Sequence, residues 1–315
     1  MNALRHDDLP DVNALDLPAE LQGRVLFNEP LARHTSWRVG GPAEVLFKPD
    51  SKADLALFLK ALPADMPILW LGLGSNLLVR DGGIRGAVIE THGALSDLQR
   101  LSDTTVWCDA GVPCAKLAKQ CAKWSLGPAE FFAGIPGTLG GALAMNAGAF
   151  GGETWRHVVE VETINRHGEI KRRLESDFEV AYRHVKGPHD EWFLGACLNF
   201  AESDADGEAE IRALLARRKE SQPIGEFSCG SVFTNPPGHH AAKLIESAGL
   251  KGFRIGGAVV STKHANFIIN EGEATAAEIE QLIAHVQATV QQQYGVELKP
   301  EVRIVGEAAP AKELE

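Results

Sequence analysis

The chain of 315 residues has few tyrosines, no paired cysteines and no excess of positive charge. Its five cysteines are scattered, with no C-x-x-C pair, which argues against a disulfide framework or a structural zinc site and favours a reducing cytoplasm. The formal net charge of −11 argues against a general nucleic-acid or anionic-membrane surface, because such surfaces need a basic face. No run of about 18 apolar residues occurs, and the first residues contain no apolar signal segment. We therefore expect a cytoplasmic globular protein with no nucleic-acid or membrane partner.

Glycine, in contrast, is concentrated in one run from Phe131 to Gly148. Glycine is costly to order, but it lets the backbone approach a ligand closely and present N–H groups to a phosphate. The same run could be only a tight loop between core elements. Pro136 stiffens its first turn and so reduces the cost of ordering it. Because the run is long, flanked by apolar residues and ends in Asn146, we interpret it as a cradle for a large phosphate-bearing cofactor. The cradle residues are Gly134, Ile135, Pro136, Gly137, Gly140, Gly141 and Asn146.

A second glycine-containing turn follows the apolar stretch 67–71. It is not the start of a dinucleotide-binding Rossmann fingerprint, because no third glycine follows at the required place and the chain goes on to another turn at 81–83, not to a helix. A strand followed by a small polar turn can still present N–H groups and side chains to a pyrophosphate. The second predicted cradle consists of Gly72, Gly74, Ser75 and Asn76.

Hydrophobic periodicity predicts alternating strands and helices. Strands are expected at 43–49, 67–71, 87–90, 104–110, 158–164, 169–172, 192–197 and 296–305. Helices are expected after Ser51, from Pro113 to about Trp124, at 208–219, at 240–248 and from Thr275 to Gly295, with capping boxes at Ser51–Asp54 and Thr275–Glu278. The strands after residue 158 have the spacing of hairpins, so we expect an antiparallel or mixed sheet there.

Two residue pairs have metal-like spacing but favour other interpretations. Cys114 and Cys121 share one helix face with apolar residues, where small buried cysteines are far commoner than ligands. His239 and His240 are adjacent and would point apart on a helix, so we interpret them as solvated. No metal site is predicted.

Five motifs stand in the order and approximate spacing of the UDP-N-acetylenolpyruvoylglucosamine reductase family. They are 71–76 (LGLGSN), 133–141 (AGIPGTLGG), 182–183 (YR), 230–236 (GSVFTNP) and 300–303 (PEVR). The chain resembles this family from about residue 26 to 306. The resemblance implies an α+β protein with a two-part module of the vanillyl-alcohol-oxidase-like type, which holds FAD without a covalent link, and a C-terminal α+β substrate-binding domain.

Changes in sequence pattern predict a flexible lead-in (1–21), a disordered tail (307–315) and boundaries near residues 92 and 222. On the resemblance, the parts between them are two FAD-binding subdomains (22–92 and 93–222) and a substrate-binding domain (223–306). The implied reaction is NADPH-dependent, FAD-mediated reduction of UDP-N-acetylglucosamine enolpyruvate to UDP-N-acetylmuramate in peptidoglycan precursor synthesis. The implied protein is a monomer whose partner is this small-molecule substrate.

The resemblance also implies roles for single residues. Arg183 would hold the substrate carboxylate and, with Glu301, stabilise the developing enolate, while Ser231 would protonate the α-carbon. Glu301 needs a raised pKa for this task. Substrate contacts are expected from Tyr182, Asn235, Lys243 and Lys263.

The short spacing between Arg183 and Ser231 matches the family's shorter, second type, which lacks an extra tyrosine-bearing loop. Val185 stands where the family commonly has a serine. Two other functions remain open at this point: an FAD-dependent oxidase of the same superfamily acting on an alcohol or sugar, and a nucleotide-sugar binding protein without catalysis.

Overall fold

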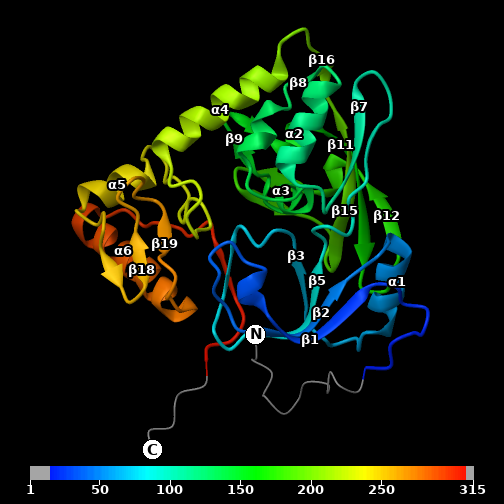
Figure 1. The fold of residues 1–315 in the computed structure, drawn as a ribbon, viewed down its shortest axis with the longest axis horizontal. Coiled ribbons are helices and arrows are strands. Elements are labelled where there is room, and N and C mark those ends of the chain that lie inside the picture. Colours follow the sequence, from blue (N-terminus) through cyan, green and yellow to red (C-terminus); the bar gives the residue numbers. More distant parts are fainter. Residues whose placement is uncertain (1–14, 310–315) are drawn as a thin grey trace, which may run out of the picture.

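The structure, a computed structural model, describes residues 15–309. Figure 1 shows three groups of elements around a common centre: a sheet drawn in blue, a larger sheet with helices drawn in green, and a C-terminal group drawn in yellow to red. Helix α4 (Gly207–Ser221) runs from the second group toward the third. The mixed helix and strand content confirms the expected α+β class.

The first group is a four-stranded sheet whose order is β1-β2-β5-β3. Its members are β1 (Arg24–Pro30), β2 (Pro42–Lys48), β3 (Ile68–Leu71) and β5 (Ile84–Glu90), with α1 (Lys52–Ala61) between β2 and β3. Strand β1 is antiparallel to β2, whereas β2, β5 and β3 are parallel. Val45 and Phe47 pack with α1, while Leu46 packs into a cluster on the opposite face. This alternation buries the sheet on both faces.

The second group is a five-stranded antiparallel sheet in the order β12-β11-β15-β7-β6. Its strands are β6 (Leu98–Arg100), β7 (Thr105–Asp109), β11 (Val158–Asn165), β12 (Ile170–Arg173) and β15 (Glu191–Asn199). The predicted hairpin character of this region is therefore confirmed. The helices of this group are α2 (Cys114–Lys123), α3 (Leu139–Met145) and α4. Cys114 and Cys121 are buried in its core, and burial raises the pKa of both thiols to about 12.

The C-terminal group has a small antiparallel sheet, β17-β18-β19, with two helices. The elements are α5 (Ala241–Ser247), β17 (Arg254–Ile255), β18 (Ala258–Val260), β19 (Ile268–Asn270) and α6 (Ala276–Tyr294). Helix α6 begins at the predicted capping box, in which Thr275 and Glu278 each accept a hydrogen bond from the other's backbone N–H. It ends at Gly295, whose φ of +67° suits glycine.

Short elements complete the fold. The paired strands are β9 (Gly148–Ala149) with β10 (Gly152–Glu153), β13 (Glu179–Ala181) with β14 (His184–Lys186), β8 (Leu126–Gly127) with β16 (Ala201–Glu202), and β4 (Leu77–Val79) with β20 (Arg303–Val305). Single 3-10 turns lie at Leu31–Arg33, Glu130–Gly134, Thr154–His157 and Glu175–Asp177. The parallel β4–β20 pair returns the C-terminal segment to the first group.

Side chains also join the groups. Trp37 lies in the C-terminal core although it belongs to the first group by sequence, and its Nε1 donates to the carbonyl of Ile268 at 2.8 Å. Lys52 on α1 places Nζ 2.7 Å from Glu162 Oε1 and 3.2 Å from Asp109 Oδ1 in the second group. Side-chain contacts thus connect the first group to both of the others.

Several local predictions need correction. Only Arg303–Val305 of the predicted strand 296–305 is a strand, because the segment divides its hydrogen bonds: Lys299 and Glu301 bond with Thr234 and Val232, whereas residues 303–305 pair with β4. Pro113 occupies the N-cap position just before α2, so the helix begins at Cys114 and not at the proline.

At the ends of the described chain, order extends further than expected. Leu15, Leu17 and Leu21 of the predicted lead-in pack against the α1 core, and residues 1–14 lie outside the described part. Glu307 of the predicted tail pairs with Gly83, and residues 310–315 again lie outside.

Candidate active site

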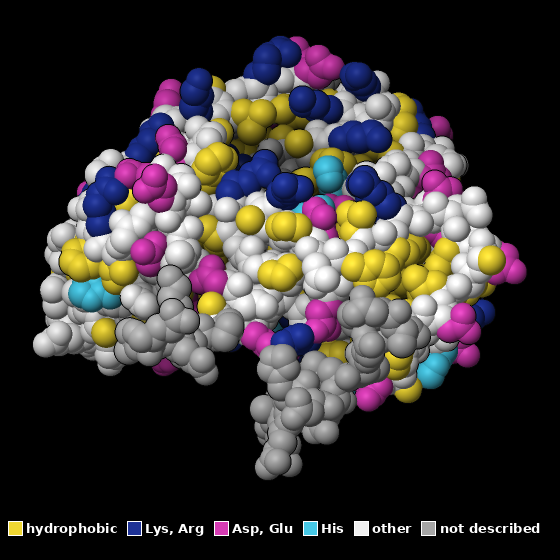
Figure 2. Space-filling model, turned by 60° about the horizontal axis from the view of Figure 1, so that its bottom comes forward, with side chains coloured by type: hydrophobic (Ala, Val, Ile, Leu, Met, Phe, Trp, Pro, Cys, Tyr) yellow, Lys and Arg dark blue, Asp and Glu magenta, His cyan; other side chains and the backbone are white. Residues whose placement is uncertain are grey.

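A cavity of about 1020 Å³ lies between the three groups and takes lining residues from all of them. Figure 2 shows one face of the molecule with a hollow, near which Lys and Arg side chains gather beside apolar ones. The predicted site residues that line the cavity are Gly72, Gly74, Ser75, Asn76, Gly134, Ile135, Pro136, Gly137, Gly140, Gly141, Tyr182, Arg183, Ser231, Asn235, Lys243 and Glu301. The structure therefore brings both cradles and the three predicted catalytic residues to one site.

The second cradle, residues 72–76, turns sharply between β3 and β4. Gly74 has φ +60°, and a Cβ built there would lie 2.1 Å from the carbonyl oxygen of His34, so the turn requires glycine. Asn76, expected to reach the cofactor, directs its Nδ2 to the carbonyl of Glu301 at 3.0 Å. Its side chain therefore fixes the backbone of a predicted catalytic residue while also lining the cavity.

The glycines of the long run have two different functions. A Cβ on Gly134 would lie 2.4 Å from the Phe150 ring, and one on Gly140 would lie 2.9 Å from Ala110 Cβ, so close packing explains both. At Gly137 the nearest atom to an added Cβ is Ser75 Oγ, at 3.4 Å. A methyl group at Gly137 would thus reach van der Waals contact with Ser75, so the two cradles approach each other closely at this point.

Thr138 of the long run lies against Gly72 of the other cradle. Its Oγ1 lies 2.5 Å from the position of a Cβ built on Gly72. Although Thr138 is the N-cap of α3, its hydroxyl does not cap the helix, and this buried oxygen has no hydrogen-bond partner within residues 15–309. Trp70 Nε1, also on the cavity wall, is likewise buried and unpaired within the described chain.

Buried polar atoms normally have partners, because an unpaired group carries its full desolvation cost. Two such atoms beside open glycine backbone in a cavity of this size fit a large polar ligand. FAD meets this requirement, since it offers acceptors along its pyrophosphate and polar atoms on its rings. The residues present, including the predicted cradles at 72–76 and 134–141, therefore fit FAD.

Arg183 lies at the tip of the β13–β14 hairpin, in a two-residue turn with Tyr182. Its φ of +54° is uncommon for a residue with a side chain. The guanidinium donates to the carbonyls of Asn146 (3.3 Å) and Gly148 (2.9 Å), and its Nε lies 3.1 Å from Glu301 Oε1. The Tyr182 ring packs against it at 5.2 Å. Arg183 is thereby held as a fixed cation on the cavity wall.

Glu301 reaches the same place from the segment before β20. Burial raises the pKa of its carboxyl, and the nearby Arg183 guanidinium opposes that rise. A carboxyl in this setting can hold a proton at higher pH than an exposed one and donate a hydrogen bond. The predicted requirement for a raised Glu301 pKa is therefore met in direction.

Ser231 follows Gly230, whose φ is +80°, on a loop that packs against the Glu301 segment. Val232, the next residue, accepts hydrogen bonds from the Glu301 and Val302 backbone N–H groups. These contacts place the serine and the carboxylate on one wall of the cavity, where both are lining residues.

Two predicted contacts are not at the site. Lys263 does not line the cavity, and its Nζ donates to the carbonyl of Lys219. Asn146 does not line it either, because its side chain is hydrogen-bonded to the protein at both ends. The direction of both side chains is set by contacts with residues distant in sequence, which no local pattern shows.

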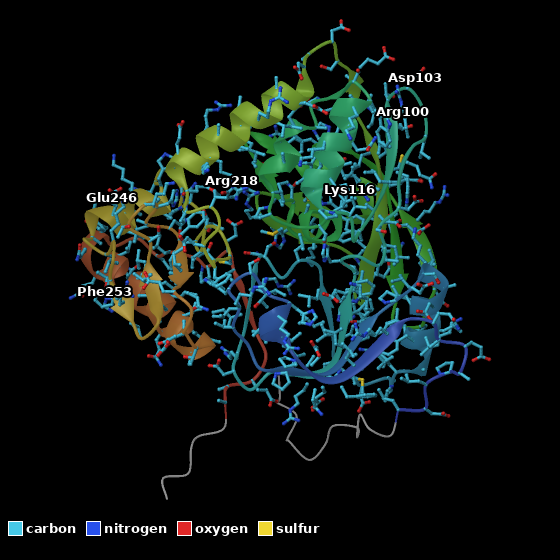
Figure 3. All side chains as sticks on the ribbon, in the orientation of Figure 1. Arg100, Asp103, Lys116, Arg218, Glu246 and Phe253 are labelled. Atoms are coloured by element: carbon cyan, nitrogen blue, oxygen red, sulfur yellow. The ribbon has the colours of Figure 1, made fainter. Side chains whose placement is uncertain are left out.

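Arg218 and His264 are among the cavity residues that sequence reasoning missed. Arg218 lies on the part of α4 that runs toward the C-terminal group (Figure 3), donates to the carbonyl of Gly134 at 2.6 Å and has no carboxylate partner within the described chain. Burial lowers its pKa, yet guanidinium remains charged in proteins. His264 has a buried, unpaired Nδ1, and burial lowers its pKa. The arginine-rich helix was the only signal for Arg218, and nothing local distinguishes His264 from the other histidines.

Within the described residues, no group of three or more His, Cys, Asp or Glu side chains could hold a metal ion. The described helices include none that is long and apolar enough to cross a membrane.

Comparison with known proteins gives concordant results along the chain. Residues 222–305 match the family described as UDP-N-acetylenolpyruvoylglucosamine reductase, C-terminal domain, and residues 43–173 match the FAD binding domain family. A UDP-N-acetylenolpyruvoylglucosamine reductase of Alkalilimnicola ehrlichii is 60% identical over 281 residues, covering 89% of this chain and 94% of the relative. One from Legionella pneumophila strain Paris is 58% identical over 291 residues, covering 92% and 96%.

A solved structure agrees with these matches. The UDP-N-acetylenolpyruvylglucosamine reductase of Thermus caldophilus superposes with a TM-score of 0.76 and 30% identity, covering 90% of this chain and 98% of that one. The site geometry and these comparisons agree, and the chain belongs to the UDP-N-acetylenolpyruvoylglucosamine reductase family as an FAD-dependent oxidoreductase.

Proposed function

We propose that this chain reduces UDP-N-acetylglucosamine enolpyruvate to UDP-N-acetylmuramate with NADPH as the reductant. The family's reaction belongs to peptidoglycan synthesis. The observation that carries the proposal is the Arg183–Glu301 pair, 3.1 Å apart, in one cavity with Ser231 and both cradles. We further propose that the protein acts in the cytoplasm as a monomer.

FAD, when bound between the cradles, supplies the hydride that it receives from NADPH. Thr138 and the 72–76 and 134–141 backbones would hold it. Everything else the reaction needs comes from side chains of this chain: a cation for the substrate's carboxylate, a neutral donor for the developing enolate, and a proton for the α-carbon.

Arg183 binds the enolpyruvyl carboxylate. Its planar, positively charged guanidinium matches a carboxylate, and two backbone carbonyls hold it in place. As negative charge grows on that carboxylate during reduction, the fixed cation stabilises it more than it stabilises the ground state. When the substrate carboxylate arrives, it shares the Arg183 guanidinium with the Glu301 carboxyl.

Glu301 then loses part of its electrostatic support and holds a proton more firmly, because burial already raises its pKa. In this neutral form it donates a hydrogen bond to the enolate oxygen. Ser231 delivers the proton to the α-carbon from the same wall. Lys243 and Asn235, on the C-terminal side of the cavity, bind the nucleotide-sugar part of the substrate.

An anaerobic stopped-flow experiment tests the proposal. Purified holoenzyme is mixed first with NADPH and then with UDP-N-acetylglucosamine enolpyruvate, while the visible flavin absorbance is followed. Bleaching by NADPH and rapid recovery with the nucleotide sugar, with UDP-N-acetylmuramate as product, are the expected results. Reduced flavin that is reoxidised only by air would identify an oxidase, and protein without flavin would leave a binding function; either result would overturn the proposal.

A further inference from the structure

Asn146 lies where α3 ends, beside the hairpin that carries Arg183. It is 4% exposed and has left-handed backbone angles, φ 45° and ψ 53°. Its side-chain Nδ2 donates to the carbonyl of Ala181 at 3.2 Å, and its Oδ1 accepts from the backbone N–H of Trp155 at 3.1 Å. The side chain is therefore occupied by the protein itself, at both ends.

Asn146 has two hydrogen-bond partners on the hairpin, one just before the turn and one in it. Ala181 is the last residue of β13, and Arg183, two residues on, donates its Nη1 to the backbone carbonyl of Asn146 at 3.3 Å. A third bond runs from Arg183 Nη2 to the carbonyl of Gly148 at 2.9 Å. Of the three hydrogen bonds that hold this turn against the α3 corner, two involve Asn146.

The turn needs such support. Arg183 has φ +54°, a conformation that costs free energy for a residue with a Cβ and persists only where surrounding contacts enforce it. The hairpin strands supply only three paired positions, and both flanking strands are largely exposed. The position of the guanidinium therefore depends on the corner that it contacts.

Asparagine suits this corner for two reasons. It tolerates the left-handed region better than other residues with a side chain, and its amide is a donor and an acceptor at once. Aspartate would keep the acceptor for Trp155 but could not donate to Ala181. Glycine would keep the backbone conformation and lose both bonds.

We propose that Asn146 is a positioning residue, which holds the Arg183 hairpin so that the guanidinium lies beside Glu301. It replaces the cofactor contact expected from the sequence. The inference rests on the proposed function in one respect, the role of Arg183 in the step that consumes the nucleotide sugar. The chain from Asn146 through Ala181 and Arg183 to Glu301 consists entirely of contacts between described residues.

The test compares Asn146→Gly and Asn146→Asp with Thr154→Val as the matched control. Thr154 lies at the same corner, and its Oγ1 donates to the carbonyl of Ala147 at 2.7 Å, not to a hairpin residue. Valine removes that buried hydrogen bond at nearly constant volume. All three variants are assayed as FAD-loaded full-length protein for thermal stability, the NADPH half-reaction, the nucleotide-sugar half-reaction and hydrogen exchange of the 179–186 segment.

We expect Asn146→Gly and Thr154→Val to lower Tm alike. Only the Asn146 variants should slow the nucleotide-sugar half-reaction, by about tenfold or more, with faster hydrogen exchange in 179–186 and an unchanged NADPH half-reaction. The rate of the nucleotide-sugar half-reaction should fall at high pH, and in the Asn146 variants this alkaline limb should move to higher pH. The reason is that Arg183 lowers the Glu301 pKa and would do so less from a displaced position. A purely structural role would not shift this limb.

Arg183→Lys, measured in parallel, separates the two hypotheses. If Arg183→Lys is slow while both Asn146 variants keep the wild-type rate and exchange, the positioning role is wrong and the proposed function stands. A slow rate in Thr154→Val equal to that of Asn146→Gly would also overturn it. If Arg183→Lys itself retains the wild-type rate, the proposed role of Arg183 fails first. Should Asn146→Gly not fold, Asn146→Asp, which keeps the Trp155 bond, decides between these outcomes.

Discussion

Arg183 Nε lies 3.1 Å from Glu301 Oε1, although one residue comes from a hairpin of the second group and the other from the segment that returns to the first. The two therefore meet only when the chain has closed around the cavity. Because burial raises the Glu301 pKa while Arg183 opposes the rise, the pair couples charge recognition to protonation.

This coupling predicts the pH dependence of the nucleotide-sugar half-reaction. In the proposed mechanism Glu301 acts as a donor in its protonated form. Because its pKa in the folded protein lies above the usual value, the rate should fall as pH rises through that raised pKa. Glu301→Gln keeps a neutral donor at every pH. We expect the variant to be slower than wild type at low pH but to lose this alkaline limb, as measured by stopped flow across a pH series. An identical limb in both proteins would assign it to another group.

The unpaired hydroxyl of Thr138 predicts a contribution to cofactor binding. Thr138→Val should weaken FAD binding by about tenfold to a hundredfold, the effect of losing one hydrogen bond to a charged group. The apoprotein should keep its Tm or gain slightly, since valine removes a buried oxygen without a partner among residues 15–309. Titration of apoprotein with FAD measures the first effect and calorimetry the second. Unchanged affinity would show that this oxygen does not face the cofactor.

Alanine substitutions at two cradle glycines should have different effects, one on fold stability and the other on FAD binding. Gly74→Ala should destabilise the fold by about 3 kcal/mol or more, because a positive φ is combined with a 2.1 Å contact to backbone. Gly137→Ala should fold with nearly normal apoprotein stability, since its nearest neighbour is 3.4 Å away, but the new methyl group would intrude between the cradles. With both quantities measured on both variants, Gly74→Ala should lower the apoprotein Tm, whereas Gly137→Ala should lower the affinity for FAD. Wild-type FAD affinity in Gly137→Ala would contradict the location of the cradle.

Two lysines form a matched pair for substrate binding. Lys243 lines the cavity, whereas Lys263 donates to the carbonyl of Lys219 outside it. Lys243→Met should raise the KM for the nucleotide sugar by about tenfold, equivalent to about 1.4 kcal/mol. Lys263→Met should leave KM within about twofold of wild type, and steady-state kinetics at saturating NADPH decide. The reverse ranking would place the nucleotide elsewhere.

Predictions from sequence succeeded where the determining contacts are local. The α6 capping box needs only Thr275 and Glu278, three residues apart, and it forms as expected. At Ser51 only half of the box forms, because the Asp54 carboxylate instead accepts from the backbone of Gln22, Gly23 and Asp50. Contacts distant in sequence redirected that side chain, and no local pattern shows them.

The same distinction applies at the site. The motif residues were identified by type, but Asn146 and Asn76 point to backbone carbonyls of Ala181 and Glu301, more distant along the chain than any local pattern reaches. Arg218 and His264 become cavity residues only through the packing of α4 and the C-terminal group against the cradles.

The most direct test of the central claim uses the holoenzyme photoreduced without NADPH and mixed anaerobically with UDP-N-acetylglucosamine enolpyruvate. Wild type should recover its flavin absorbance and form one UDP-N-acetylmuramate per flavin. Ser231→Ala should recover about a hundredfold to ten-thousandfold more slowly, the range expected for loss of a proton donor. Flavin that stays reduced until air is admitted, or equal recovery in both proteins, would contradict the account.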